Sequence, residues 1–489
     1  MSRFPVLRPG AFAITTGDHR NPPGAAMIQE ADLEALRGSV RGIVGLPGEA
    51  AYAEDTASYN LAQVHRPDAA LGALDADDVA NAVAWAAQRG IPLGVQATGH
   101  SASAPMDEGL LINTSRLEEV AVDQAAGTVT VGAGVRWSAV LEELVPLGLT
   151  AAHGSSSRVG VVGYTLGGGL PLMGRSLGFA ADHVRSFEVV TPDGTARRVD
   201  PDQEPELFAV LRGGKGNYGI VTEMTFGAVP LGEFYGGQIV FPEEAAGDVL
   251  ELFRRWAPDL PHEASASLAF MHLPDVPFVP EELRGSAPVL LRFGFFGGQE
   301  EGGALLEPMR ALPLLRDTVG LMDYGAVDSI HDDPAGPMPS MERGMLLADL
   351  GEEGTAELLR HVGPGSDTPL VMAELRLLGG ALAADPAVPD AVSGRGAGFH
   401  LFILGVPGLP AEDAVEAALA RLAAGFEPYA AGSLINFHGP AGDEQDRARA
   451  WEPEAYARLR SAKATWDPQN LFRYGHAVPP LGLMDSATG

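Results

Sequence analysis

The sequence contains no cysteine among its 489 residues. Disulfide bonds, cysteine-based zinc sites, iron–sulfur clusters and thiol catalysis are therefore excluded together. Long apolar runs are also missing, since no segment reaches the roughly 20 apolar residues that a membrane-spanning helix needs. The N-terminal stretch is interrupted by prolines and lacks an apolar core of the length that a signal peptide requires. These absences predict a soluble, cytoplasmic protein.

Positive charge is scarce, because 33 lysines and arginines stand against 64 aspartates and glutamates, a formal net charge of −31. A nucleic acid is an unsuitable partner, since binding its phosphates depends on an excess of lysine and arginine. An anionic membrane surface is disfavoured for the same reason. We interpret the negative charge as an aid to solubility. Neither a P-loop nor the metal-binding pattern H-E-x-x-H occurs, and no metal site is predicted.

The chain is longer than the size at which one hydrophobic core usually stops growing, which predicts two domains or subdomains. Residues 73–90 carry apolar side chains at helical spacing and end in Arg89 and Gly90, so a helix is expected there. A short buried strand, 91–95, follows it. A hairpin is expected near residue 193, with Asp193 and Gly194 both supplying positive φ angles. Strands and helices of this mixed kind predict an α+β fold.

The pattern changes at about residue 232. Strand-like runs then follow one another with helical runs between them, which predicts an antiparallel sheet covered by helices on one face. The segment 331–342 is expected to be a loop. Close to the C-terminus, a helix is expected to end at Asp467-Pro468, before a short aromatic tail.

Two loops are unusually rich in glycine. The first, VQATGHSAS (95–103), places His100 between a glycine and a serine, and the second, 153–184, contains the triplet 167–169. Glycine permits positive φ and close backbone approach, so such loops can wrap a flat or anionic group with their N–H donors. Tight turns around a packed core are the competing interpretation. A nicotinamide-binding Rossmann fingerprint fits neither loop, because its glycine spacing at a strand-to-helix turn is not met.

The order of these segments carries a resemblance. A strand leads into ATGHS, a strand–helix pair follows, and then come SSSRVGVVGYTLGGG, RGGKGNYGIVTEM and DPQNLFR. Over residues 60–230 and 440–480 this series resembles the vanillyl-alcohol-oxidase (PCMH) type of FAD-binding fold, and most closely its berberine-bridge-enzyme-like branch. The resemblance implies an FAD-binding domain (1–231), a substrate-binding domain with an antiparallel sheet (232–439), and a C-terminal segment (440–489) that returns to the FAD domain.

The family's first loop reads approximately R-x-G-G-H-S, and its histidine often bonds covalently to the flavin 8α-methyl group. His100 matches that histidine, while Gln96 replaces the arginine and Thr98 the first glycine. Ser156 stands where doubly linked members carry a cysteine, so a sulfur link is impossible and either one histidyl link at His100 or a noncovalent contact remains. The cofactor contacts that the resemblance implies are Gln96, Ala97, Thr98, Gly99, His100, Ser101, Gly154, Ser155, Ser156, Val159, Gly160, Gly163, Tyr164, Gly168, Gly169, Gly219, Ile220, Val221, Asn470 and Phe472.

The family's base is often the tyrosine of a Y-x-N-[FY] motif on the last strand of the substrate domain. In this sequence Leu434 replaces that tyrosine, and leucine cannot accept a proton. Either another residue is the base, or the reaction needs none, or the protein no longer oxidises anything. The favoured replacements are His438 and Tyr324, and the other candidates are His400, His272 and Tyr164.

The resemblance implies an FAD-dependent oxidase or dehydrogenase of a small organic molecule, expected in natural-product biosynthesis. The substrate would pass a hydride to flavin N5 and a proton to a side chain, and O2 would reoxidise the flavin with release of hydrogen peroxide. Two alternatives stay open. One is a non-redox cyclase or isomerase in which FAD only shapes the pocket, and the other is a flavin-binding protein without catalysis. The sequence does not indicate the oligomeric state.

Overall fold

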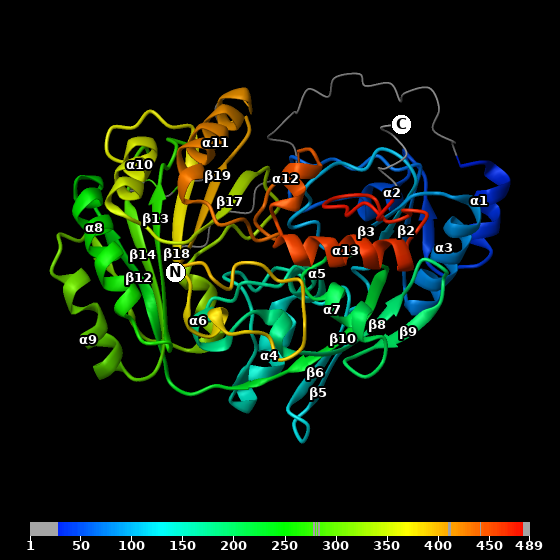
Figure 1. The fold of residues 1–489 in the computed structure, drawn as a ribbon, viewed down its shortest axis with the longest axis horizontal. Coiled ribbons are helices and arrows are strands. Elements are labelled where there is room, and N and C mark those ends of the chain that lie inside the picture. The colour runs from blue at the N-terminus through cyan, green and yellow to red at the C-terminus, as the bar shows by residue number, and fades with distance from the viewer. Residues whose placement is uncertain are drawn as a thin grey trace.

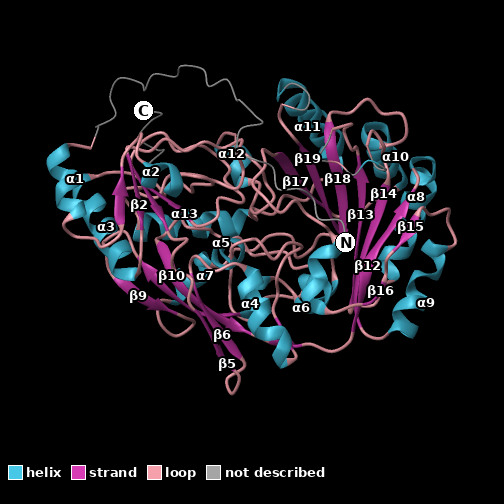
Figure 2. Ribbon diagram, turned by 180° about the vertical axis from the view of Figure 1, so that it is seen from behind, coloured by secondary structure: helices cyan, strands magenta, loops and turns pink. Residues whose placement is uncertain are grey.

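The protein forms two neighbouring parts, one built around two small sheets and the other around a single large sheet (Figure 1). Figure 2 shows the same two parts from behind. Across the described part of the chain, no helix combines the length and the apolar character needed to cross a membrane. The computed structural model describes residues 28–276, 279, 281, 284–408, 412–440 and 442–482, so the N-terminal stretch in which we expect no signal peptide lies outside it.

The first small sheet has the strand order β1-β2-β4-β3. Strands β2, β4 and β3 are parallel, and β1 is antiparallel to β2. The predicted helix is present as α3: the Asp75 side chain accepts a hydrogen bond from Asp78 N at its start, and Gly90 ends it with a φ of 63°. The elements of this layer are β1 (Ile43–Gly45), β2 (Ala69–Gly72), β3 (Leu93–Gln96), β4 (Leu110–Asn113), α1 (Glu30–Arg37), α2 (Ala50–Asp55) and α3 (Ala76–Arg89).

The second small sheet is antiparallel throughout, with the order β5-β6-β10-β8-β9. Helix α3 packs against β8 and β10 as well as against β4, so it joins the two small sheets. The elements are β5 (Val120–Asp123), β6 (Thr128–Gly132), β8 (Val184–Val190), β9 (Ala196–Val199), β10 (Ile220–Gly227), α4 (Trp137–Leu144), α5 (Val161–Leu166), α6 (Gly174–Leu177) and α7 (Pro205–Leu211), while a short ladder pairs β7 (Leu149–Thr150) with β11 (Val229–Pro230).

The predicted hairpin joins β8 to β9, but its turn differs from the expectation. Gly194 has a φ of 76°, whereas Asp193 does not have a positive φ. The strands separate after Val190 and rejoin at Ala196, so the loop is longer than a two-residue turn. The Asp193 carboxylate accepts hydrogen bonds from Thr191 Oγ1 and Thr195 N instead. Because the longer loop needs only one left-handed residue, glycine alone supplies it.

The large sheet follows the order β15-β12-β14-β13-β18-β19-β17, and β16 also pairs with β12. Every pairing is antiparallel, and helices cover one face (Figures 1 and 2), which confirms the predicted arrangement. The elements are β12 (Phe234–Phe241), β13 (Ala264–Met271), β14 (Val289–Phe296), β15 (Arg316–Asp317), β16 (Gly320–Leu321), β17 (Met341–Leu347), β18 (Leu370–Leu377), β19 (Phe399–Gly405), α8 (Ala246–Trp256), α9 (Gln299–Arg310), α10 (Glu352–Val362) and α11 (Glu412–Phe426).

The segment 331–342 is a loop up to its last residues, where β17 begins at Met341. Its backbone connects the two parts of the protein, because Met338 N donates to Tyr59 O at 3.0 Å and Leu61 N donates to Met338 O at 3.1 Å. These hydrogen bonds tie the large-sheet part to the small-sheet part, and the face of the large sheet that carries no helices is turned towards the small sheets (Figures 1 and 2).

The C-terminal segment returns to the small sheets, as the red ribbon in Figure 1 shows. It contains α12 (Glu444–Ala448) and α13 (Pro453–Trp466), and the helix ends before Asp467 as predicted. Beyond it, Leu93 N donates to Leu471 O at 2.9 Å, and Leu93 forms a parallel bridge with Phe472. The tail therefore extends the first small sheet beyond β3.

Candidate cofactor-binding and active site

A cavity of about 360 Å³ lies where these parts meet. Most of its wall comes from four stretches that are far apart in the sequence, namely 93–104, 154–166, 215–221 and 472–476. Arg376, Asn436 and Phe437 add a wall from the large-sheet part. The cavity therefore has one long side formed by the small sheets and the tail, and one end that faces the uncovered sheet.

The first glycine loop leaves β3 at Gln96, whose side chain anchors it. Gln96 Nε2 donates to Ala57 O at 2.8 Å, and Ser58 Oγ donates to Gln96 Oε1 at 2.7 Å. Gly99 has a φ of 64°, and a Cβ there would lie 2.7 Å from Ser58 Cα. Both its backbone angle and its surroundings therefore require glycine at this position. The loop is held tightly against residues 57 and 58, which fixes His100 beside the cavity.

His100 lines the cavity with its imidazole packed on Tyr59, at 4.3 Å between ring centroids. Its Nδ1 atom is buried and has no hydrogen-bond partner among the described residues. Burial lowers the pKa of His100, so the ring is neutral at neutral pH and keeps a nitrogen lone pair. A buried polar atom without a partner costs free energy unless a ligand engages it. His100 is thus positioned for a group that enters the cavity.

The second glycine loop forms the opposite wall around α5. A Cβ on Gly163 would meet no atom within 4 Å, and Gly163 lines the cavity, so its backbone faces open space. Ser156 lines the same wall at the position of the absent cysteine. Behind this wall, Tyr164 packs edge-on against Trp137 with ring centroids 5.7 Å apart.

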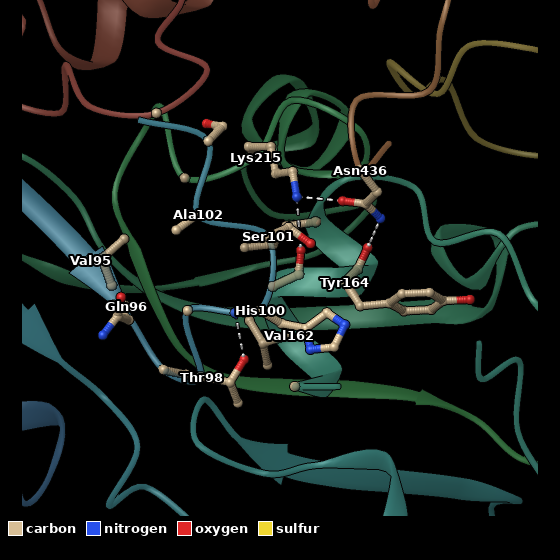
Figure 3. A pocket seen from close by; sticks show the side chains of 18 of the residues that line it. Val95, Gln96, Thr98, His100, Ser101, Ala102, Val162, Tyr164, Lys215 and Asn436 are labelled. Atoms are coloured by element: carbon tan, nitrogen blue, oxygen red, sulfur yellow. Dashed lines mark hydrogen bonds between the residues drawn. The ribbon is translucent and has the colours of Figure 1, made fainter. Parts of the chain in front are cut away.

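Lys215 is a site residue that sequence analysis missed. It lines the cavity in a left-handed conformation, with a φ of 60°, and its Nζ donates to Asn436 Oδ1 and, at 3.4 Å, to Gly163 O. Asn436 Nδ2 in turn donates to Tyr164 O at 2.8 Å, a chain of contacts that Figure 3 shows. The available signal was the lysine that interrupts the glycine run in RGGKGN. Lys215 and Lys463 are the only lysines in the chain.

The surroundings of Lys215 bring the pKa of its amine close to neutral pH. Burial lowers the pKa of Lys215 to about 8, although the nearby Glu342 opposes the shift. Burial likewise raises the pKa of the Glu342 carboxyl to about 7, opposed by Lys215. An amine whose pKa lies near the working pH can both hold and release a proton. This residue gives the cavity an acid–base group.

Most of the predicted cofactor contacts line this one cavity, but Gly168, Gly169 and Asn470 do not. Gly168 O and Gly169 O accept hydrogen bonds from Ala181 N and Ala180 N, so this turn supports the second loop from behind. Asn470 turns the tail with a φ of 53°. The predicted residues that line the cavity are Gln96, Ala97, Thr98, Gly99, His100, Ser101, Gly154, Ser155, Ser156, Val159, Gly160, Gly163, Tyr164, Gly219, Ile220, Val221 and Phe472.

The two favoured base candidates lie outside the cavity lining. Tyr324 OH lies 2.9 Å from His153 Nε2, and the tyrosine ring packs on Phe234 with centroids 4.9 Å apart. His438 is buried behind the lining residue His476, with ring centroids 5.6 Å apart. Burial raises the pKa of Tyr324 and lowers the pKa of His438 to about 4.

Most of the remaining residues considered for the base also lie away from the cavity. Leu434 packs in a hydrophobic cluster with Leu346 and does not line the cavity. His400 is wholly buried in the large sheet, and His272 Nε2 lies 3.1 Å from Val362 O. Among these candidates, Tyr164 alone lines the cavity.

The lining suits the FAD that the family resemblance implies. A flat ring system can pass between two loops whose nearest backbone carries no side chain, and His100 Nδ1 offers a nitrogen without a partner. The wall also reaches from the first small sheet to the uncovered face of the large sheet, which gives a dinucleotide the length it needs. The residues that would hold the cofactor are those of the two glycine loops, the 215–221 stretch and Phe472.

Two family models match the chain, an FAD-binding domain over residues 67–200 and the family described as berberine and berberine like over residues 439–479. An uncharacterized FAD-linked oxidoreductase of Bacillus subtilis, YgaK, is 27% identical over 443 residues, which cover 88% of this chain and 95% of the relative. The (R)-6-hydroxynicotine oxidase of Paenarthrobacter nicotinovorans is 24% identical over 475 residues, covering 90% and 98%.

A solved structure of glucooligosaccharide oxidase from Acremonium strictum, described as carrying a 6-S-cysteinyl, 8α-N1-histidyl FAD, superimposes with a TM-score of 0.81 at 19% identity over 92% of this chain and 99% of that one. The fold and its cavity thus define a PCMH-type FAD-binding oxidoreductase, and the α+β prediction is confirmed. Within that class, the chain is similar to the berberine-bridge-enzyme-like FAD-linked oxidoreductases, whose two family models it matches.

Proposed function

We propose that the protein is an FAD-dependent oxidase or dehydrogenase of a small organic molecule, with O2 as the electron acceptor. The observation that carries this proposal is the single cavity that joins His100 to Lys215, Arg376 and Phe437. One end presents the groups expected to hold a flavin, and the other presents polar and aromatic groups to a substrate. The names of relatives such as (R)-6-hydroxynicotine oxidase support an oxidase rather than a nicotinamide-linked enzyme.

The cofactor link that the residues support is a single histidyl bond at His100. Its Nδ1 is unpartnered, and its neutral ring keeps a lone pair. Ser156 offers no sulfur for a second link. A noncovalent contact through the same nitrogen is the alternative, and acid denaturation separates the two.

Bound FAD would supply the redox chemistry, accepting a hydride from the substrate and passing the electrons to O2 to give hydrogen peroxide. The chain's part is to bind and orient the substrate and to take its proton. We assign the proton to Lys215 Nζ, because this amine lines the cavity, is held by Asn436 and Gly163, and has a pKa of about 8. Leu434 stands where the family often has a tyrosine that accepts this proton, and leucine cannot accept it. Lys215 lines the cavity from a different segment of the chain.

The experiment is anaerobic mixing of the flavin-loaded protein with a panel of small alcohols, amines and organic acids. An oxidase loses its visible flavin absorbance with at least one compound, and admission of air restores the absorbance and yields hydrogen peroxide. Conversion of a compound without any loss of absorbance would instead identify the non-redox cyclase or isomerase. Binding with neither bleaching nor conversion would identify a flavin-binding protein without catalysis.

A further inference from the structure

A row of polar side chains crosses the uncovered face of the large sheet. Arg292 pairs in register with Gln238 and Ser267, Ser267 pairs with Arg376, and Arg376 pairs with His400. Residues paired across neighbouring strands project from the same face of a sheet. The opposite face carries the neighbours that belong to the core under the helices, namely Leu268, Leu291, Leu375 and Leu401. The polar row therefore faces the small sheets and the cavity.

This row carries more positive charge than its acidic partner can balance. Arg292 Nη1 lies 2.7 Å from Glu374 Oε1, and Arg376 Nη2 lies 2.7 Å from Glu374 Oε2. Burial works to raise the pKa of Glu374, but Arg376 and Arg292 hold it well below its usual range, so the carboxylate is ionised. Burial lowers the pKa of His331, which leaves its ring neutral beside Glu374. Two guanidinium groups thus share one carboxylate.

The other charged groups nearby do not remove the surplus. Arg175 is buried, and its guanidinium donates to the backbone oxygens of Ala264, Leu260 and Leu378, so it adds positive charge with no acidic partner among the described residues. Asp332 and Asp333 follow His331 and are exposed, so water screens the attraction between Asp332 and Arg292, while Asp333 lines the main cavity instead of the polar row. An uncompensated buried cation is costly unless a ligand completes the pairing.

A small cavity of about 40 Å³ lies against this row and shares Ser155, Leu170 and Arg376 with the wall of the main cavity. Three of its lining side chains keep a buried polar atom without a partner among the described residues, namely Arg292 Nε, Ser265 Oγ and His331 Nδ1, and the first two are donors. Arg376 bonds to Glu374 through Nε and Nη2, and no hydrogen bond links its Nη1 to a described residue. Side chains with unpartnered donors therefore line a small pocket beside the proposed active site.

We infer that this pocket is a subsite for a carboxylate, so that the substrate is a small organic acid. The surplus positive charge requires an anion, and the planar guanidinium groups match the planar carboxylate. A volume of about 40 Å³ accommodates on the order of three water-sized groups, which suits a carboxylate better than a tetrahedral phosphate. The inference rests on the proposed function, because the pocket shares three wall residues with the main cavity and would orient the acid towards the flavin end.

The test compares two ligands of the same shape, benzoate and neutral benzamide, with the flavin-loaded protein. Binding is followed by the change in the visible flavin spectrum and by the melting temperature. We expect benzoate to bind at least tenfold more tightly than benzamide. Equal affinities, no binding of either ligand, or tighter binding of phenyl phosphate would overturn the carboxylate subsite.

Substitutions of pocket residues test whether the pocket causes the preference for benzoate. Arg292→Met is expected to weaken benzoate binding at least tenfold and to leave benzamide unchanged. Ser265→Ala is expected to weaken the binding of benzoate severalfold. Because Ser265 Oγ has no partner among the described residues, this substitution breaks no ion pair and should not impair folding. The matched control is Arg255→Met on α8, which removes the same charge from an exposed position on the covered side of the sheet. An equal loss in Arg255→Met would contradict the assignment.

The experiment distinguishes a failure of the proposed FAD-dependent function from a failure of the carboxylate subsite. A protein that cannot take up flavin contradicts the proposed function, whereas a flavin-loaded protein without preference for benzoate contradicts the subsite alone. The melting temperature reports benzoate binding whether or not the flavin is present.

Discussion

Lys463 Nζ lies 2.7 Å from Asp467 Oδ2, and neither side chain is exposed to solvent. Lys463 also donates to Asn217 O at 2.9 Å and to Phe472 O at 2.6 Å, so it joins α13, the tail and the 215–221 stretch. We predict that Lys463→Met lowers the free energy of unfolding by about 3–5 kcal/mol, because it leaves a buried carboxylate without its partner. Urea unfolding, with flavin retention measured on the same samples, checks this.

The control for this prediction is Arg473→Met in the same tail. Arg473 lies 3.2 Å from Glu108, but both side chains are 41% exposed, so its loss should cost less than about 1 kcal/mol. Equal losses of stability in the two variants would show that the buried pair has no special role.

The covalent link at His100 is tested by acid denaturation. We expect the yellow colour to stay with the precipitated wild-type protein and to move into solution for His100→Ala, because no other residue in the two loops matches a known attachment position. Ser156→Ala should keep the colour in the precipitate, since a serine forms no flavin link. Release of the flavin from the wild type would mean that His100 only contacts it.

The proton exchange of Lys215 can be observed without a substrate. The chain has only two lysines, so protein labelled with 13C at the lysine ε position gives two signals, and Lys215→Arg removes one of them. We expect the Lys215 signal to titrate near pH 8, because burial disfavours the ammonium form. A value near 10.4, the ordinary value for lysine, would show that the amine is fully solvated.

The same shift predicts the pH dependence of flavin reduction. Lys215 accepts a proton only when neutral, so the reduction rate should rise as the pH increases to about 8 and level off above it. Both Lys215→Met and Lys215→Arg should abolish this rise, because a guanidinium keeps the charge but does not release its proton. Stopped-flow reduction measures it, and wild-type rates in Lys215→Arg would assign Lys215 an electrostatic role instead.

His400 should make the fold sensitive to acid. It is wholly buried, neither ring nitrogen has a partner among the described residues, and burial lowers its pKa to about 3. The unfolded chain takes up a proton near pH 6.5 and the folded chain near 3, so stability falls with decreasing pH across that window. His400→Leu should reduce the slope of unfolding free energy by about 1.4 kcal/mol per pH unit. An unchanged slope between pH 4 and 6 would contradict the buried, neutral state.

The sequence predicted the parts of the fold whose signals are local. Helix α3 has a helical apolar pattern with capping residues, and the strands of the large sheet are long enough to show a run of apolar residues. Strands β1, β2 and β4 have only three or four residues, too few for a periodic signal, and β17 begins inside the segment 331–342 that was expected to be a loop. The turn at Asp193 differed because loop length, which the sequence did not specify, decides how many positive φ angles are needed.

In the site, too, only the features with a local sequence signal could be predicted. The two glycine loops were recognisable because glycine at fixed spacing has few interpretations, whereas the base depended on which side chains meet across the cavity. Lys215 and Asn436 are 221 positions apart, and their contact is set by the packing of the two parts. Tyr324 was a reasonable candidate from its apolar context, but that context is the packing around His153 and Phe234. Local sequence carries no information on such distant contacts.

Flavin uptake by the purified protein shows most directly whether the cavity holds FAD. We predict visible flavin absorbance corresponding to an equimolar amount of FAD, either as isolated or after incubation with FAD. Gly99→Val, in which the added Cβ would lie 2.7 Å from Ser58 Cα, should take up none while the large sheet stays folded. A folded wild-type protein that shows no flavin absorbance and does not acquire it on incubation with FAD would contradict the central claim.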